Sequence, residues 1–164
     1  MKLSLCITED TTANSEGDSS GRNYEKISDV LERELLTLYP DSKNYESVEI
    51  SLTFMNPDGI RALNKEYRDV DEATDVLSFP MLDENQPVGL PELPVLALGD
   101  IIICPEEVAR LHPELESNEA IYLMIAHSFL HLLGFDHDTD EKQVAMWETQ
   151  NAIKDKILAA MEAN

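Results

Sequence analysis

The segment of residues 127–137, HSFLHLLGFDH, restricts the local fold more than any other part of this sequence. On a helix, His127 and His131 lie one turn apart on the same face, so both imidazoles can reach a single ion. Gly134 lets the chain reverse direction without a side-chain clash, and His137 can then return toward the same point. The pattern therefore predicts a helix that ends near Gly134 and a turn that gathers three imidazoles.

Three neutral nitrogen ligands with one open position are typical of a catalytic zinc site, because a structural site is more often closed by a fourth protein ligand. Zinc held in this way lowers the pKa of its bound water to about 7, which supplies hydroxide near neutrality. We therefore predict one Zn²⁺ ion at His127, His131 and His137. Nickel, cobalt or copper would also accept three imidazoles. The alternative is that these histidines lie near one another by chance.

The same spacing matches the metzincin protease pattern H-E-x-x-H-x-x-G-x-x-H, with one difference. Ser128 stands where the protease has its glutamate general base. A serine hydroxyl cannot take a proton from zinc-bound water at neutral pH, so position 128 disfavours peptide hydrolysis. A zinc peptidase with metzincin-like spacing remains an alternative at this point.

Hydrophobic periodicity assigns most of the other residues to strands and helices. Alternation predicts four strands, at residues 2–8, 48–54, 76–81 and 96–104. We expect the third strand to lie at an edge of the sheet, because it contains Pro80. Helical spacing and capping residues predict five helices. Three are expected at residues 24–38, 57–67 and 105–111, a fourth from Ser117 to Gly134, and a fifth after a capping box of Asp138 and Glu141. Residues 11–22 and 83–94 are predicted loops, and Trp147 and the methionines are interpreted as core.

Strands mixed with helices, followed by a helical end, predict an α+β fold. We expect a single domain over residues 1–164, with a small mixed β-sheet packed against helices and a zincin-like histidine helix. Two cysteines are too few for a disulfide-rich scaffold. The first residues lack the features of a signal peptide, and no segment approaches the roughly 20 apolar residues of a membrane span. A cytoplasmic location without a membrane partner is therefore expected.

The charge of the chain limits how it can bind nucleic acid. Twelve Lys and Arg residues against 33 Asp and Glu residues give a formal net charge of −21. This balance excludes a broad basic surface that binds nucleic acid by counterion release alone. Arg61, Lys65 and Arg68 recur near the spacing of a helical turn and form a candidate basic stripe that leads to the metal.

Three blocks of residues resemble the YbeY family of bacterial metal-dependent endoribonucleases. The first block is LNKEYR at residues 63–68 followed by TDVLSFP at residues 74–80, and the second is LGDIIIC at residues 98–104. The third is the histidine segment, where the family usually reads H-G-x-L-H-L-L-G-Y/F-D-H. Ser128 replaces the family's glycine, and its hydroxymethyl group would narrow the approach to the ion if that glycine leaves room beside it.

The resemblance implies a cytoplasmic, zinc-dependent endoribonuclease that prefers single-stranded RNA. It implies a role in ribosomal RNA maturation, including the 3′ end of the small-subunit RNA, and in ribosome quality control. The implied partners are ribosomal RNA and the ribosome or its associated proteins, and not DNA. The resemblance assigns zinc to His127, His131 and His137 and catalysis to Arg68. A guanidinium and a metal ion can stabilise the charge that develops on phosphorus, whether water or the ribose hydroxyl attacks.

Several further residues allow two interpretations. Asp136 and Asp138 flank the third histidine and either orient a ligand imidazole or serve a turn and a helix cap. Asp75 fits a turn, and His112 fits an ordinary polar position in a helix. A third functional alternative is a non-enzymatic, ribosome-associated module whose metal holds the last helices together.

Overall fold

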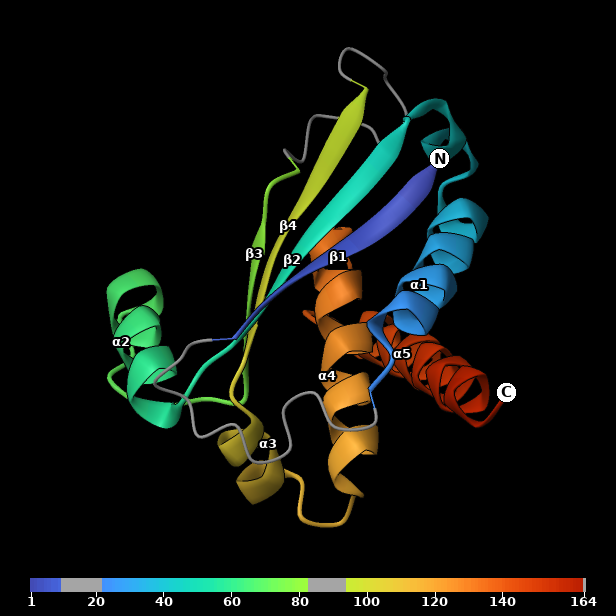
Figure 1. Cartoon of the computed structure of the whole chain (residues 1–164). Helices are drawn as coiled ribbons and strands as arrows, with labels where there is room; N and C mark the ends of the chain where they lie inside the picture. Colours follow the sequence, from blue (N-terminus) through green and yellow to red (C-terminus); the bar gives the residue numbers. More distant parts are fainter. Residues whose placement is uncertain (10–21, 83–93, 164) are drawn as a thin grey trace.

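Four strands form one mixed sheet in the computed structural model, which describes residues 1–9, 22–82 and 94–163 (Figure 1). Their order across the sheet is β1 (Lys2–Glu9), β2 (Ser47–Phe54), β4 (Val95–Ile103) and β3 (Val76–Pro80). The first three strands are parallel, and β3 pairs with β4 in the antiparallel direction. Pro80 lies in the edge strand, as predicted, where its missing N–H group need not interrupt a ladder on the outer side.

The helices lie on both faces of the sheet. They are α1 (Tyr24–Leu38), the 3₁₀ helix η1 (Pro40–Asn44), α2 (Pro57–Arg68), α3 (Pro105–Leu111), α4 (Ser117–Leu132) and α5 (Asp140–Glu162). A side-chain hydrogen bond caps the first turn of four of those described, α1, α2, α4 and α5. The side chain of Asn56 accepts a hydrogen bond from the amide of Gly59 at 2.7 Å, which caps the first turn of α2. Figure 1 shows α1, α4 and α5 gathered on one side of the sheet, with α2 beyond β3 at the other side. The α+β fold with a small mixed sheet is confirmed.

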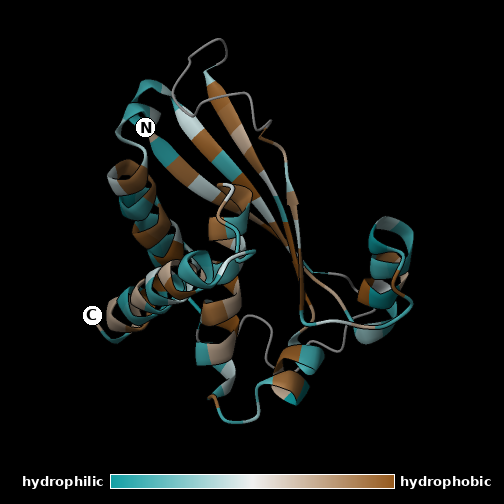
Figure 2. Ribbon diagram, turned by 180° about the vertical axis from the view of Figure 1, so that it is seen from behind, coloured by the Kyte–Doolittle hydropathy of each residue, from teal (hydrophilic) through white to brown (hydrophobic). Residues whose placement is uncertain are grey.

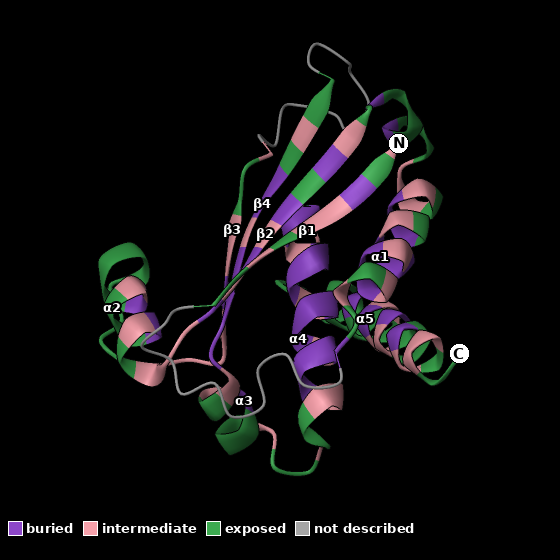
Figure 3. Cartoon of the chain, in the orientation of Figure 1, coloured by how far each residue is buried: buried purple, intermediate pink, exposed green. Residues whose placement is uncertain are grey.

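The core lies between the sheet and α4, because the strands alternate in burial and α4 is apolar on nearly all sides. Helix α4 contacts β3 and β4 on one side and α5 on another, and Figures 2 and 3 show it as hydrophobic and buried over most of its length. Alternation within β4 sends Ile101 and Ile103 into this core and Ile102 to the opposite face. There Ile102 packs with Leu77 and with Ile60 of α2. This second, smaller cluster holds α2 beside the edge strand.

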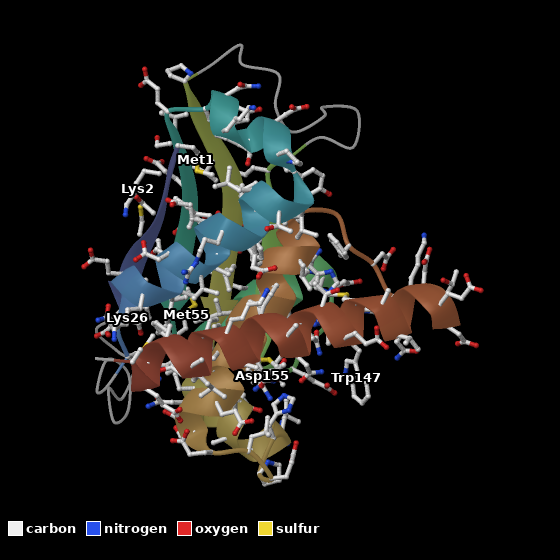
Figure 4. All side chains as sticks on the ribbon, turned by 90° about the vertical axis from the view of Figure 1, so that its right-hand side faces the viewer. Met1, Lys2, Lys26, Met55, Trp147 and Asp155 are labelled. Carbon is white, nitrogen blue, oxygen red and sulfur yellow. The ribbon has the colours of Figure 1, made fainter. Side chains whose placement is uncertain are left out.

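Three expectations about α4 and α5 are wrong. Glu116, and not Ser117, caps α4 by accepting from two backbone amides. Thr139, and not Asp138, caps α5 by accepting from the amide of Lys142. Trp147 is 67% exposed, and Figure 4 shows its ring projecting from α5. The inward stripe of this helix consists of positions 146, 150, 153 and 157, and residue 147 lies about 100° away from position 146.

The remaining expectations about the chain meet different outcomes. Met124 and Met146 are buried as predicted, whereas Met81 is exposed. The predicted loops at residues 11–22 and 83–94 lie almost wholly outside the described residues. Within the described ranges, no helix combines the length and apolar character that crossing a bilayer requires.

Candidate active site

A cavity of about 350 Å³ lies between β3 and α4. Arg68 lines it from the end of α2, Ser78 and Pro80 line it from β3, and two histidines line it from α4. These are His127 and His131. The fold therefore brings the predicted catalytic arginine and two of the predicted metal ligands to one cavity, although they are far apart in the sequence.

His127 and His131 converge through the same ring nitrogen. Their Nε2 atoms are 3.0 Å apart and their ring centroids are 4.5 Å apart. Two nitrogen ligands that share a tetrahedral zinc ion at 2.0–2.1 Å would be roughly 3.3 Å apart. The spacing of the two Nε2 atoms is close to this value, and the chemistry of the pair suits a divalent metal ion.

His137 lies beside this pair on the turn that follows α4. Gly134 has φ +94°, a left-handed conformation that permits the reversal predicted from the sequence. The ring centroid of His137 is 5.5 Å from that of His131, and its side chain is exposed. Across the parts of the chain that the structure describes, no three His, Cys, Asp or Glu side chains form a complete ligand set. His127 and His131 are therefore already positioned to share an ion, whereas the ring of His137 must turn toward them to become the third ligand.

The environment of His131 favours the neutral imidazole that a metal requires. Burial is the largest cause that lowers its pKa, and the nearby rings of His127 and His137 lower it further. The carboxylate of Asp136 and a hydrogen bond with the backbone of Phe135 oppose this shift without reversing it. The lowered pKa of His131 therefore favours a neutral ring at neutral pH, the form in which an imidazole can bind a metal ion.

Gln150 is a functional candidate that the sequence analysis missed. Its Oε1 atom lies 2.7 Å from Nδ1 of His127, and the residue is only 6% exposed. The signal was present in the sequence, because Gln150 occupies a polar position within the inward stripe of α5 that otherwise contains Met146, Ile153 and Ile157. A buried polar side chain in such a stripe requires a partner.

Arg68 is the last residue of α2, and the turn after it sets its position. Asp69 adopts a left-handed conformation with φ 59°, which ends the helix. Nη2 of Arg68 donates to the carbonyl oxygen of Ser78 at 2.7 Å, and its Cζ lies 5.2 Å from the centroid of the Phe79 ring. No carboxylate among the described residues forms an ion pair with this guanidinium. Its positive charge is therefore available at the cavity.

The predicted basic stripe is weaker than its sequence suggests. Arg61 donates through Nε to the carboxylate of Asp71 at 2.9 Å, and this interaction raises the pKa of Arg61 and lowers that of Asp71. The two opposite charges offset each other. Arg68 is thus the stripe member that lines the cavity with a free charge.

Comparison with known proteins identifies the family. The family model described as Endoribonuclease YbeY matches residues 12–158. The chain belongs to this family. It is 37% identical to Endoribonuclease YbeY of Lachnoclostridium phytofermentans, with 82% of this chain and 91% of that protein covered, and 41% identical to that of Clostridioides difficile, with 81% and 84% covered. The solution structure of TM1509 from Thermotoga maritima has a TM-score of 0.53 at 24% identity, covers 96% of this chain and 89% of its own, and so supports the fold alone.

Membership of the YbeY family confirms the main functional interpretation of the sequence. The relatives are endoribonucleases, which are hydrolases acting on RNA. Their names support neither the zinc peptidase nor the non-enzymatic module.

Ser128, which replaces the family's usual glycine, is not among the residues that line the cavity. The side chain of Ser128 is fully buried. Ser128 lies one helical turn before Leu132, whose side chain lies against Gly99 of β4. Within the described ranges its Oγ atom has no hydrogen-bond partner. The hydroxyl therefore lies in the packed interior and not at the cavity.

The acidic residues around the site make local hydrogen bonds and ion pairs. Asp136 accepts from the backbone amide of His137 at 2.7 Å, and Asp138 pairs with Lys142 at 3.3 Å. Asp75 accepts from the amide of Val76, as expected of a turn residue, and its other oxygen lies 3.0 Å from Nε2 of His112. His112 is not the ordinary polar residue within a helix that the sequence predicted, because it is the C-cap that follows α3 and it contacts the carboxylate of Asp75.

Proposed function

We propose that the chain is a zinc-dependent endoribonuclease that cleaves single-stranded RNA. In this proposal His127, His131 and His137 hold the ion, and Arg68 contacts the phosphate to be cleaved. The observation that supports it is a single cavity lined both by the converging Nε2 atoms of α4 and by a guanidinium without a carboxylate partner in the described chain.

The chemistry of the two groups is complementary. A bound zinc ion supplies a Lewis acid that polarises a phosphoryl oxygen and lowers the pKa of a water molecule. Arg68 presents a planar set of N–H donors that matches the oxygens of a phosphodiester. Its contacts with the Ser78 carbonyl and the Phe79 ring restrict the guanidinium before RNA binds. Its charge then stabilises the extra negative charge of the pentavalent transition state.

The products of cleavage identify the nucleophile. A terminal cyclic phosphate requires attack by the neighbouring ribose hydroxyl and excludes direct attack by water. Products that carry a 5′-phosphate and a 3′-hydroxyl from the start of the reaction indicate attack by water, because attack by the ribose 2′-hydroxyl releases a 5′-hydroxyl instead. Product analysis of a short RNA of defined sequence separates these routes.

We further propose that the enzyme works in the cytoplasm in ribosomal RNA maturation, including the 3′ end of the small-subunit RNA, and in ribosome quality control. The formal net charge of −21 repels RNA from most of the surface, so free RNA binds weakly outside the cavity. Delivery of RNA by the ribosome or an associated protein compensates for this weak attraction. Cleavage of ribosome-bound precursor RNA should then be faster than cleavage of the same RNA free in solution.

The central experiment combines metal analysis with cleavage of unstructured and hairpin RNA. We expect about one zinc ion per chain in the wild type and in Arg68→Ala, and less in His131→Ala. Cleavage of unstructured RNA should fall by about 10²–10³-fold in Arg68→Ala. Arg33→Ala is the matched control, because Arg33 is an exposed arginine of α1 that does not line the cavity. Undiminished cleavage by Arg68→Ala, or equal cleavage by metal-free wild type, contradicts the proposal.

A further inference from the structure

Gln150 connects the last helix to the candidate metal centre. Its Oε1 atom is 2.7 Å from Nδ1 of His127, and the glutamine is buried between α5 and α4. We propose that Gln150 is a positioning residue that holds His127 in the tautomer with its proton on Nδ1, leaving the Nε2 lone pair for the ion. This inference rests on the proposed function and deepens it.

The direction of the hydrogen bond follows from the chemistry of the amide. An amide oxygen only accepts hydrogen bonds, so Nδ1 of His127 must be the donor. A neutral imidazole has one N–H group, and Nε2 therefore has a free lone pair. This Nε2 is the atom that lies 3.0 Å from Nε2 of His131. Without the acceptor, part of the population would place the proton on the ligand nitrogen.

Packing alone does not explain a glutamine at this position. Its neighbours on the inward stripe of α5 are Met146, Ile153 and Ile157, all buried. A leucine would continue this apolar surface, whereas a buried amide has an energetic cost that a hydrogen bond must offset. The observed partner is a predicted metal ligand, so the polar group is placed where it orients that ligand.

A glutamine also differs from the carboxylate that often accepts from a metal-bound histidine. A carboxylate raises the basicity of the ligand ring and adds a negative charge near the ion. The neutral amide fixes the same tautomer without that charge. Because α4 and α5 are both regular helices in contact, the donor and acceptor are held on rigid elements.

The test measures zinc affinity and tautomer rather than RNA cleavage. Gln150→Leu removes the acceptor at similar volume, Gln150→Asn shortens its reach, and Gln150→Glu restores an acceptor. We expect the Leu and Asn variants to bind zinc about 10–100-fold more weakly in chelator competition, and the Glu variant to remain within about tenfold of the wild type. The matched control is Gln143→Leu, the same change at an exposed position of α5, which should leave affinity unchanged.

Nitrogen NMR of the zinc-free protein gives a second, independent readout. His127 should be protonated at Nδ1 in the wild type and should exchange between tautomers in Gln150→Asn. If Gln150→Leu fails to fold, the Asn variant replaces it in both measurements. Wild-type zinc affinity in folded Gln150→Leu or Gln150→Asn overturns the inference about Gln150. A wild-type protein that binds no zinc overturns the proposed function instead, and the two failures are therefore distinct.

Discussion

The surroundings of Gly99 allow an estimate of how far one added methyl group would lower the free energy of unfolding. Gly99 lies in β4 with φ +145°, where L-amino acids are strained. A Cβ atom there would be 2.3 Å from the carbonyl oxygen of Phe79 and 2.8 Å from Cδ2 of Leu132. The leucine methyl can move, but the carbonyl belongs to the backbone of the paired strand β3. The Gly99→Ala substitution therefore combines backbone strain with a backbone collision.

Each contribution has a known scale. Backbone strain of this kind costs about 1–3 kcal/mol, and overpacking costs typically about 1–3 kcal/mol. We expect Gly99→Ala to lower the free energy of unfolding by about 2–6 kcal/mol, a large part of the roughly 5–15 kcal/mol that stabilises a domain. The displaced segment also includes Ser78, whose carbonyl holds Arg68, so RNA cleavage should fall as well.

The assay is urea unfolding of zinc-free protein, with Gly134→Ala as the matched control. Gly134 has φ +94°, but no atom lies within 4 Å of its ideal Cβ position. The control therefore measures strain without collision, at about 1–3 kcal/mol. Gly99→Ala should cost about 1–3 kcal/mol more than the control. An equal loss in the two variants would refute the argument that the Phe79 carbonyl excludes a side chain.

Three further predictions concern buried groups. Ser128→Ala should raise the free energy of unfolding by about 1 kcal/mol in urea denaturation, because the Oγ atom is buried without a partner in the described structure. A lower free energy of unfolding in this variant would contradict that reasoning. Cys6 is exposed, whereas burial raises the pKa of the Cys104 thiol, so Ellman's reagent at pH 8 should label one thiol rapidly in native protein and both in urea. Rapid native labelling of both thiols contradicts this. Asn64→Ala should lower the free energy of unfolding by about 1–2 kcal/mol, because the Asn64 amide donates to the carbonyl of Glu72 at 2.9 Å; an unchanged urea midpoint would argue that the bond adds no stability.

Local sequence patterns predicted which helices and strands form more accurately than they predicted where each of them begins and ends. The alternation of residues 48–54 and the helical spacing of residues 24–38 correspond closely to β2 and α1. Errors arose where neighbouring polar residues compete for one cap, as with Asp138 and Thr139. Trp147 was misassigned because an aromatic residue in an apolar stretch does not reveal on which side of the helix the core lies.

Some features of the candidate site also follow from local sequence patterns, whereas others depend on how distant elements pack. The pairing of His127 with His131 follows from helix geometry, because residues four positions apart share a face wherever the helix packs. The role of Gln150 depends on the contact between α4 and α5, which no local pattern encodes. The position of Arg68 at the cavity depends on β3, because the carbonyl of Ser78 holds the guanidinium there.

The amino-acid sequence by itself determined the elements, the histidine helix with its glycine turn, and the family, because these depend on spacing along one stretch of chain. The tertiary structure decided which charges are free, which polar groups meet, and where a methyl group cannot fit. Arg61 is offset by Asp71 while Arg68 faces the cavity, and this difference is invisible in their spacing. Contacts between distant segments depend on how the sheet and helices pack together, and packing is a property of the whole fold.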